Sequence, residues 1–122
     1  LRRVIIIEDN RASARLMSRI VESRKNSEVY LAHNGAIGLE MVRTVKPDLV
    51  ITDLMMPELD GFGVVEAIRA DDDLKNIMIV VVTAKDLTAK ERDFLEDRAD
   101  MVLQKGSFIT DDFMEQLLKR LN

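Results

Sequence analysis

This chain of 122 residues contains no cysteine, which excludes disulfide bonds, zinc–thiolate centres and thiol nucleophiles and fits a cytoplasmic protein. It has no apolar run near the roughly 20 residues that a membrane-spanning helix requires, so we expect no membrane insertion. The first apolar run, residues 4–7, is too short for the core of a signal peptide. The formal net charge of −4 offers no basic face to a phosphate backbone, so we expect no direct nucleic-acid binding.

Hydrophobic residues make up 47% of the chain and charged residues 33%, values that are typical of a folded globular protein. A chain of this length can bury a core without disulfides or metals to hold it together. We therefore expect a single domain over residues 1–122. The chain begins at Leu1 rather than Met, which is compatible with a piece cut from a longer protein.

Short apolar runs alternate with amphipathic segments along the chain. Strands are expected at residues 4–7, 28–32, 49–52, 77–82 and 99–104. Helices are expected at residues 11–24, 36–45, 62–70, 88–98 and 110–121. This alternation predicts an α/β fold with one doubly wound, five-stranded parallel sheet flanked by five helices. The flavodoxin-like strand order 2-1-3-4-5 is favoured because it places the three most apolar strands in the middle.

Four of the expected strands end on polar side chains. These are Glu8 and Asp9 after the first strand, Asp53 after the third, Thr83 on the fourth and Lys105 after the fifth. Because the carboxyl ends of parallel strands meet at one edge, these side chains should surround one crevice. Each residue alone also fits a structural role, since acids cap helices and fill turns, and hydroxyls and lysines are common at strand ends. Their combination on four strand ends favours a functional site.

The chemistry of this set points to phosphoryl transfer. Three carboxylates in one crevice repel one another and attract a cation, and oxygen ligands without imidazole or thiolate select Mg²⁺ or Mn²⁺. Such an ion and the Lys105 ammonium together could neutralise a phosphoryl group, while the Thr83 hydroxyl binds one of its oxygens. Asp53 would then act as the oxygen nucleophile and form an acyl phosphate.

These residues resemble the receiver domain of two-component response regulators, and the resemblance covers essentially the whole chain. It rests on Glu8-Asp9, on Asp53 within an Asp-Leu-Met-Met-Pro-x-x-Asp-Gly segment, on Thr83-Ala84 and on Lys105. The resemblance implies that Asp53 accepts a phosphoryl group, that Thr83 binds a phosphoryl oxygen and that Lys105 pairs with the phosphoaspartate. The metal ligands that it implies are the side chains of Glu8, Asp9 and Asp53 and the backbone carbonyl of Met55.

The same resemblance implies the partners of the chain. The phosphoryl donor would be a phosphohistidine on a sensor histidine kinase or a histidine phosphotransfer domain, or a small acyl phosphate. The domain would be no enzyme in the ordinary sense, because it catalyses only its own phosphorylation and dephosphorylation. The segment 102–108 resembles receivers attached to hybrid histidine kinases. Phe108, Ile109 and the last expected helix could contribute a homodimer or docking face.

Two positions depart from the family pattern. Receivers usually carry an aromatic residue three positions before the lysine, where this chain has Val102, so the usual inward turn of a ring cannot report phosphorylation. The lysine is commonly followed by proline in a cis peptide, whereas Gly106 follows Lys105 here. Since a cis bond before a non-proline residue costs about 2.5–4 kcal/mol, we expect a trans or rearranged turn there.

Three other functions share part of this pattern. A haloacid-dehalogenase-type phosphatase needs a second Asp two residues after the nucleophile, where this chain has Met55. A flavodoxin-type electron carrier needs a Ser/Thr-rich phosphate loop and aromatic residues around the flavin, but the chain has only four Phe and one Tyr. A pseudo-receiver that docks without being phosphorylated is the nearest alternative, and the complete set of site residues argues against it.

Two further features surround the expected site. The lone histidine, His33, follows the second strand at a turn, and we interpret it as a surface residue. Met55 and Met56 follow the expected nucleophile closely and could form an apolar collar that limits the access of water and partners.

Overall fold

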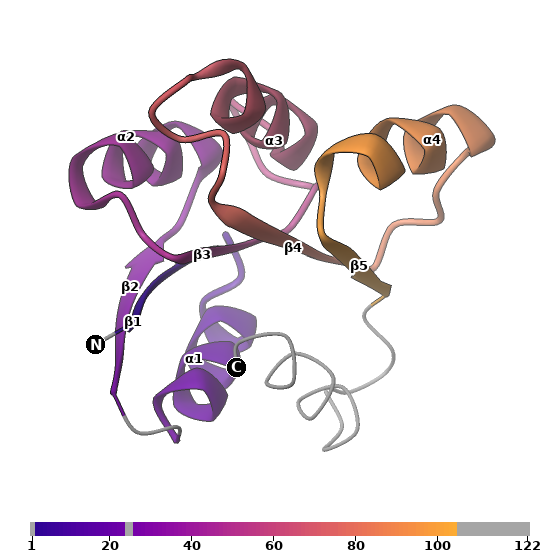
Figure 1. The fold of residues 1–122 in the computed structure, drawn as a ribbon. Helices are drawn as coiled ribbons and strands as arrows, with labels where there is room; N and C mark the ends of the chain where they lie inside the picture. Colours follow the sequence, from indigo (N-terminus) through magenta and orange to yellow (C-terminus); the bar gives the residue numbers. More distant parts are fainter. Residues whose placement is uncertain (1, 24–25, 105–122) are drawn as a thin grey trace.

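The computed structural model describes residues 2–23 and 26–104, and its elements follow the expected alternation (Figure 1). The strands are β1 (Arg2–Ile7), β2 (Ser27–Ala32), β3 (Leu49–Thr52), β4 (Met78–Thr83) and β5 (Met101–Gln104). The helices are α1 (Arg11–Glu22), α2 (Gly35–Val45), α3 (Gly61–Ala70) and α4 (Ala89–Arg98). The fifth helix, expected at residues 110–121, lies outside the described residues.

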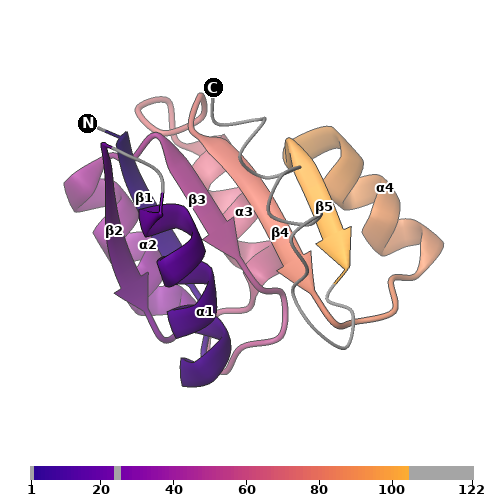
Figure 2. The ribbon, with the colours of Figure 1, turned by 90° about the horizontal axis from the view of Figure 1, so that it is seen from below.

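The five strands form one parallel sheet in the order β2-β1-β3-β4-β5, which confirms the predicted order (Figure 2). The strand with the weakest apolar pattern, β2, lies at an edge and is mostly half-buried. In contrast, every residue of β3 is buried, as expected for a central strand with helices over both faces. The sequence pattern therefore predicted both the order of the strands and which of them lie inside.

The sheet separates two apolar layers. Helices α2, α3 and α4 cover one face and α1 lies on the other (Figure 1). Successive side chains of a strand point to opposite faces, so β1 contributes to both layers. Ile5 and Ile7 pack in the cluster beneath α2, α3 and α4, whereas Val4 and Ile6 pack with Met17 of α1.

Each described helix begins at a residue whose side chain accepts a hydrogen bond from a backbone N–H three residues later. Such caps satisfy donors that the first helical turn leaves without partners. The caps of α1 to α4 are, in order, Asn10, Asn34, Asp60 and Thr88. Because all four helices begin after the carboxyl end of a strand, the caps fix the path of the loops around that edge.

The described helices are all short. The longest, α1, has 12 residues, and none of the four is long and apolar enough to cross a bilayer.

Candidate functional site

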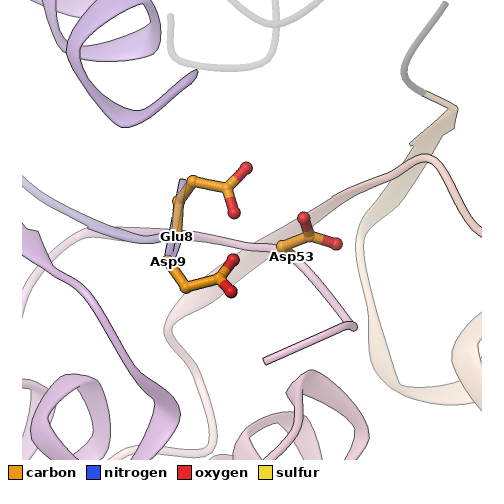
Figure 3. A group of neighbouring side chains, drawn as sticks. All are labelled: Glu8, Asp9 and Asp53. Carbon is orange, nitrogen blue, oxygen red and sulfur yellow. The ribbon is translucent and has the colours of Figure 1, made fainter. Parts of the chain in front are cut away.

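The acid residues that the sequence analysis placed at one edge of the sheet lie together. One carboxylate oxygen from each of Glu8, Asp9 and Asp53 lies within 4.8 Å of the other two. Figure 3 shows the three side chains directed toward one another, two from the end of β1 and one from the end of β3. Strands β1 and β3 are hydrogen-bonded neighbours, and Ile7 pairs with Thr52. The acids therefore meet because each follows the last residue of an adjacent parallel strand.

Two of the three acids are inside the protein. Glu8 is 0% exposed and Asp53 is 6% exposed, whereas Asp9 lies at the surface. At an effective dielectric near 20, two carboxylates at such a separation repel by roughly 3 kcal/mol. Buried charges of one sign are tolerated when a cation or hydrogen bonds compensate them. The arrangement is therefore open to a cation on its exposed side.

The donor set fits a hard divalent ion. Three carboxylates supply oxygen only, and among the described residues the cluster includes neither imidazole nor thiolate. Mg²⁺ and Mn²⁺ are bound by a few carboxylates together with carbonyl oxygens and water. The exposed carboxylate of Asp9 leaves room for the water ligands on the outer side of the cluster.

Backbone groups hold the carboxylate of Asp53 in place. Its Oδ1 accepts the N–H of Leu54 at 2.6 Å and the N–H of Met55 at 3.3 Å. Its own N–H donates to the carbonyl of Ile7 at 3.1 Å, which continues the β1–β3 ladder beyond the strand. The side chain therefore has a fixed plane, set by the loop that follows β3, before any ligand arrives.

The same loop packs closely against the start of α3. The N–H of Gly61 donates to the carbonyl of Leu54 at 3.0 Å. A Cβ at Gly61 would collide with the carbonyl oxygen of Asp53 and would lie 2.7 Å from Cα of Leu54. Only glycine therefore fits at this position without moving the backbone that carries Asp53.

Thr83 ends β4, the strand next to β3, and is 1% exposed. Its Oγ1 accepts the N–H of Lys85 at 3.1 Å. A hydroxyl that accepts one hydrogen bond still has its own hydrogen to donate. The Thr83 hydroxyl therefore keeps its hydrogen to donate while the loop after β4 holds the oxygen in position.

The other predicted site features have different outcomes. Lys105 and Gly106 lie outside the described residues, so the position of the amine and the form of that peptide bond stay predictions. Met55 is 53% exposed in the loop beside the acids, as a collar residue would be. Met56 is different, because it is half-buried and packs against the apolar cluster beneath α2 to α4. The predicted collar is therefore wrong for Met56.

Sequence reasoning missed two contacts at this edge. The side chain of Lys85 forms an ion pair with Glu91 at 3.1 Å, and Nδ1 of His33 lies 3.3 Å from the carbonyl oxygen of Glu8. The first contact joins the loop after β4 to the first turn of α4, and the second joins the loops after β1 and β2. Loop paths cannot be read from periodicity. The position of His33 directly after β2 could have indicated its proximity, since β2 pairs with β1.

Comparisons with known proteins agree with this geometry. A family model described as the response regulator receiver domain matches residues 4–118. Response regulator MprA of Mycobacterium ulcerans is 34% identical over 119 residues, which cover 98% of this chain and 48% of that protein. Hybrid signal transduction histidine kinase D of Dictyostelium discoideum is 38% identical over 82 residues, 67% of this chain and 5% of that protein.

Among solved structures, the Mn²⁺-bound form of response regulator Rcp1 matches with a TM-score of 0.83 at 21% identity, over 98% of this chain and 91% of that one. At that identity the likeness shows the fold alone. The chain spans about half the length of MprA and a small part of the hybrid kinase. The match of the family model over nearly the whole sequence is decisive, and the chain belongs to the response regulator receiver domain family.

Proposed function

We propose that Asp53 is the phosphoacceptor of this receiver domain. The observation that carries the proposal is the meeting of Glu8, Asp9 and Asp53 within 4.8 Å at the edge of the sheet. An ionised carboxylate has no proton to lose, so the reaction needs no general base. One oxygen of Asp53 forms a bond to phosphorus while the phosphorus–nitrogen bond of a phosphohistidine breaks. The electron pair of that bond stays with the departing imidazole, which takes a proton from solvent.

The proposed metal is Mg²⁺, with Mn²⁺ as a substitute. The carboxylates of Glu8, Asp9 and Asp53 would hold it together with the backbone carbonyl of Met55. When bound, the ion neutralises charge on the carboxylates and on the transferring phosphoryl group. The acid cluster and the Mn²⁺ in the structurally similar Rcp1 both support this assignment.

The remaining roles are assigned by chemistry. The Thr83 hydroxyl would donate to a phosphoryl oxygen, since it ends a strand at the same edge and can still donate its hydrogen. The Lys105 ammonium would pair with the phosphoaspartate. Because Val102 has no ring to turn, we propose that the response to phosphorylation passes through the loop that follows Thr83.

The proposed donor is a phosphohistidine on a sensor histidine kinase or a phosphotransfer domain. The relative in a hybrid histidine kinase supports a phosphorelay of that kind. Two exposed apolar side chains, Leu16 on α1 at 42% and Met55 in the loop after β3 at 53%, are suited to contact such a partner. We further propose a cytoplasmic location, and a homodimer through the last expected helix remains a prediction.

The deciding experiment is phosphorylation by acetyl phosphate, or formation of a beryllofluoride complex, with and without Mg²⁺. The native chain should gain one Mg²⁺-dependent phosphoryl group, detected as a mass increase, and the Asp53→Asn variant should gain none. An unchanged mass and an unchanged NMR spectrum of the native chain would instead favour a pseudo-receiver that docks without being phosphorylated.

A second variant tests the role of the lysine. Lys105→Ala should keep the Mg²⁺ affinity of the native chain but lose most of the spectral change that phosphorylation or beryllofluoride causes. Loss of Mg²⁺ binding in this variant would contradict the assigned role, because an ammonium does not ligate a cation.

A further inference from the structure

The β1–β2 ladder continues beyond the strands through a side chain. The N–H of Glu8 donates to the carbonyl of Ala32 at 2.9 Å, and Nδ1 of His33 lies 3.3 Å from the carbonyl oxygen of Glu8. Both polar groups of the Glu8 backbone are thereby bonded to the end of β2. The imidazole occupies the position that a backbone N–H would have in the next hydrogen bond of the ladder. His33 is half-buried rather than fully at the surface.

The chemistry of this contact fixes the state of the ring. A carbonyl oxygen can only accept a hydrogen bond, so Nδ1 must carry a hydrogen. The neutral ring must therefore be the Nδ1–H tautomer, whose Nε2 carries no hydrogen. His33 then acts on the peptide group that joins Glu8 to Asp9.

Asp9 depends on its backbone for its position. Its carboxylate is exposed, and no hydrogen bond from another described residue holds it. The orientation of Asp9 follows from the Glu8–Asp9 peptide plane, whose carbonyl oxygen lies against Nδ1 of His33. The bond from the Glu8 N–H to Ala32 holds the preceding peptide, Ile7–Glu8. A tilt of that plane would move the Asp9 carboxylate away from Asp53.

We propose that His33 is a positioning residue of the metal site: its Nδ1–H bond to the Glu8 carbonyl sets the place of the Asp9 carboxylate. The inference rests on the proposed function, because it concerns the affinity of the same acid cluster for Mg²⁺. Groups that orient metal ligands without binding the metal themselves commonly change metal affinity by roughly 10–100-fold when removed. His33 acts on the ligand's backbone, so the lower end of that range applies.

Substitution of His33 by the two amide residues distinguishes its hydrogen bond to Glu8 from simple packing of its ring. In His33→Asn the side-chain amide nitrogen occupies the place of Nδ1, so the bond to Glu8 can form again. In His33→Gln the amide nitrogen occupies the place of Nε2, and the bond is lost although more of the ring volume is kept. His33→Ala removes both the bond and the volume.

Isothermal titration of the full chain with MgCl₂ measures the effect. We expect the Kd for Mg²⁺ to rise by roughly 10-fold in His33→Ala and His33→Gln and to stay within about twofold of native in His33→Asn. The Tm without metal should differ little between the Asn and Gln variants. Equal Mg²⁺ affinity in all four proteins, or a loss in Asn as large as in Gln, would overturn the inference.

A spectroscopic measurement tests the same bond without substitution. His33 is the only histidine in the chain, so its ring nitrogens give one unambiguous set of NMR signals. The neutral ring should show hydrogen on Nδ1, and an Nε2–H tautomer would contradict the inference. If the native chain binds no Mg²⁺, the metal-dependent proposed function fails as well. If it binds Mg²⁺ but His33→Ala binds equally well, only the role of His33 is wrong.

Discussion

The ammonium nitrogen of Lys85 lies 3.1 Å from Oε1 of Glu91, and the same oxygen accepts the N–H of Thr88 at 2.9 Å. The N–H of Glu91 donates in return to Oγ1 of Thr88, which completes a capping box at the start of α4. The N–H of Lys85 donates to Oγ1 of Thr83. A continuous set of contacts therefore connects the proposed phosphoryl-binding hydroxyl to the first turn of a helix.

This network makes the contribution of Glu91 depend on pH. The hydrogen bond from the Thr88 backbone, and then that from Lys85, lower the pKa of Glu91 below its ordinary value. A carboxyl whose pKa is lower in the folded state stabilises the fold at neutral pH, and this contribution is lost as the pH falls below the ordinary pKa and through the folded-state pKa. Glu91→Gln keeps an acceptor for the Thr88 N–H but lacks the charge.

Thermal unfolding should therefore show a higher Tm for the native chain than for Glu91→Gln at pH 7, with the difference shrinking as the pH falls below the ordinary pKa of 4.5. Lys85→Gln removes the charge of the lysine from this network and should weaken the same pH dependence. A Tm difference that stays constant as the pH is lowered until the native chain unfolds in acid would contradict the assigned origin.

Glu58 has a backbone φ of 68°, in the left-handed region that side chains with a Cβ disfavour. It follows Pro57 in the exposed loop between Asp53 and α3. We expect Glu58→Gly to raise the free energy of unfolding by about 1 kcal/mol, because glycine adopts this conformation without strain. Urea denaturation measures the change. Glu58→Ala is the control: it keeps the Cβ, so it should show no such gain, and an equal gain would assign the effect to the lost charge.

Two glycines in the first turn of α3 should respond differently to alanine. A Cβ at Gly61 would collide with the backbone of Asp53, whereas a Cβ at Gly63 would lie 2.5 Å from Cδ1 of Leu59, the end of a flexible side chain. We expect Gly61→Ala to cost about 2–3 kcal/mol and to slow phosphorylation of Asp53 by roughly tenfold or more, because its loop must move. Urea denaturation and acetyl phosphate labelling measure both effects.

Gly63→Ala is the matched control within the same helical turn. Alanine favours the helix over glycine by up to about 1 kcal/mol, which should offset the small shift of Leu59. Its stability and its labelling rate should both stay near native. Similar losses in the two variants would show that the tight contact with the Asp53 backbone is not the cause.

Arg69 joins elements at the amino ends of β4 and β5, whereas the acids lie at the carboxyl ends of the strands. Its guanidinium donates to the carbonyls of Arg98 and Ile77 at 2.6 Å, to that of Lys75 at 2.8 Å and to Oδ2 of Asp100 at 3.0 Å. An ammonium cannot reproduce this planar set, so Arg69→Lys should lower the free energy of unfolding by about 2 kcal/mol.

Urea denaturation should detect this loss, while the Kd for Mg²⁺ should stay native because the acids lie at the other end of the strands. Arg43→Lys on the exposed side of α2 is the control and should change stability by less than about 0.5 kcal/mol. A weaker Mg²⁺ affinity in Arg69→Lys would show that the two ends of the strands are coupled.

The fold could be predicted from the sequence because its pattern is strong. Apolar runs bounded by turn residues placed all five strands, and their relative hydrophobicity selected the order. The errors lie at element ends. The last strand was expected from residue 99 but begins at Met101, because the N–H of Ala99 still bonds to the carbonyl of Leu95 in the last turn of α4. The fourth strand was expected from Ile77 but begins at Met78, because the N–H of Ile77 bonds to the carbonyl of Leu74 in a turn.

The acid cluster could be predicted for a similar reason. Glu8, Asp9 and Asp53 follow adjacent parallel strands, so topology alone brings them together. The contact of His33 with Glu8 could not be predicted, because it depends on a ring orientation and a loop path. The positive φ of Glu58 could not be predicted from the sequence either, since glycine or asparagine is the residue expected in that conformation.

The division of the interior into two layers limits which substitutions in this sequence can compensate for one another. Ile5 and Ile6 are neighbours in the chain, yet they belong to different clusters with the sheet backbone between them. A void opened beneath α1 cannot be filled by enlarging a side chain beneath α3. Compensating substitutions must therefore arise within one layer, and each layer can evolve separately. Strand β1 is constrained by both layers, because its side chains pack in each of them.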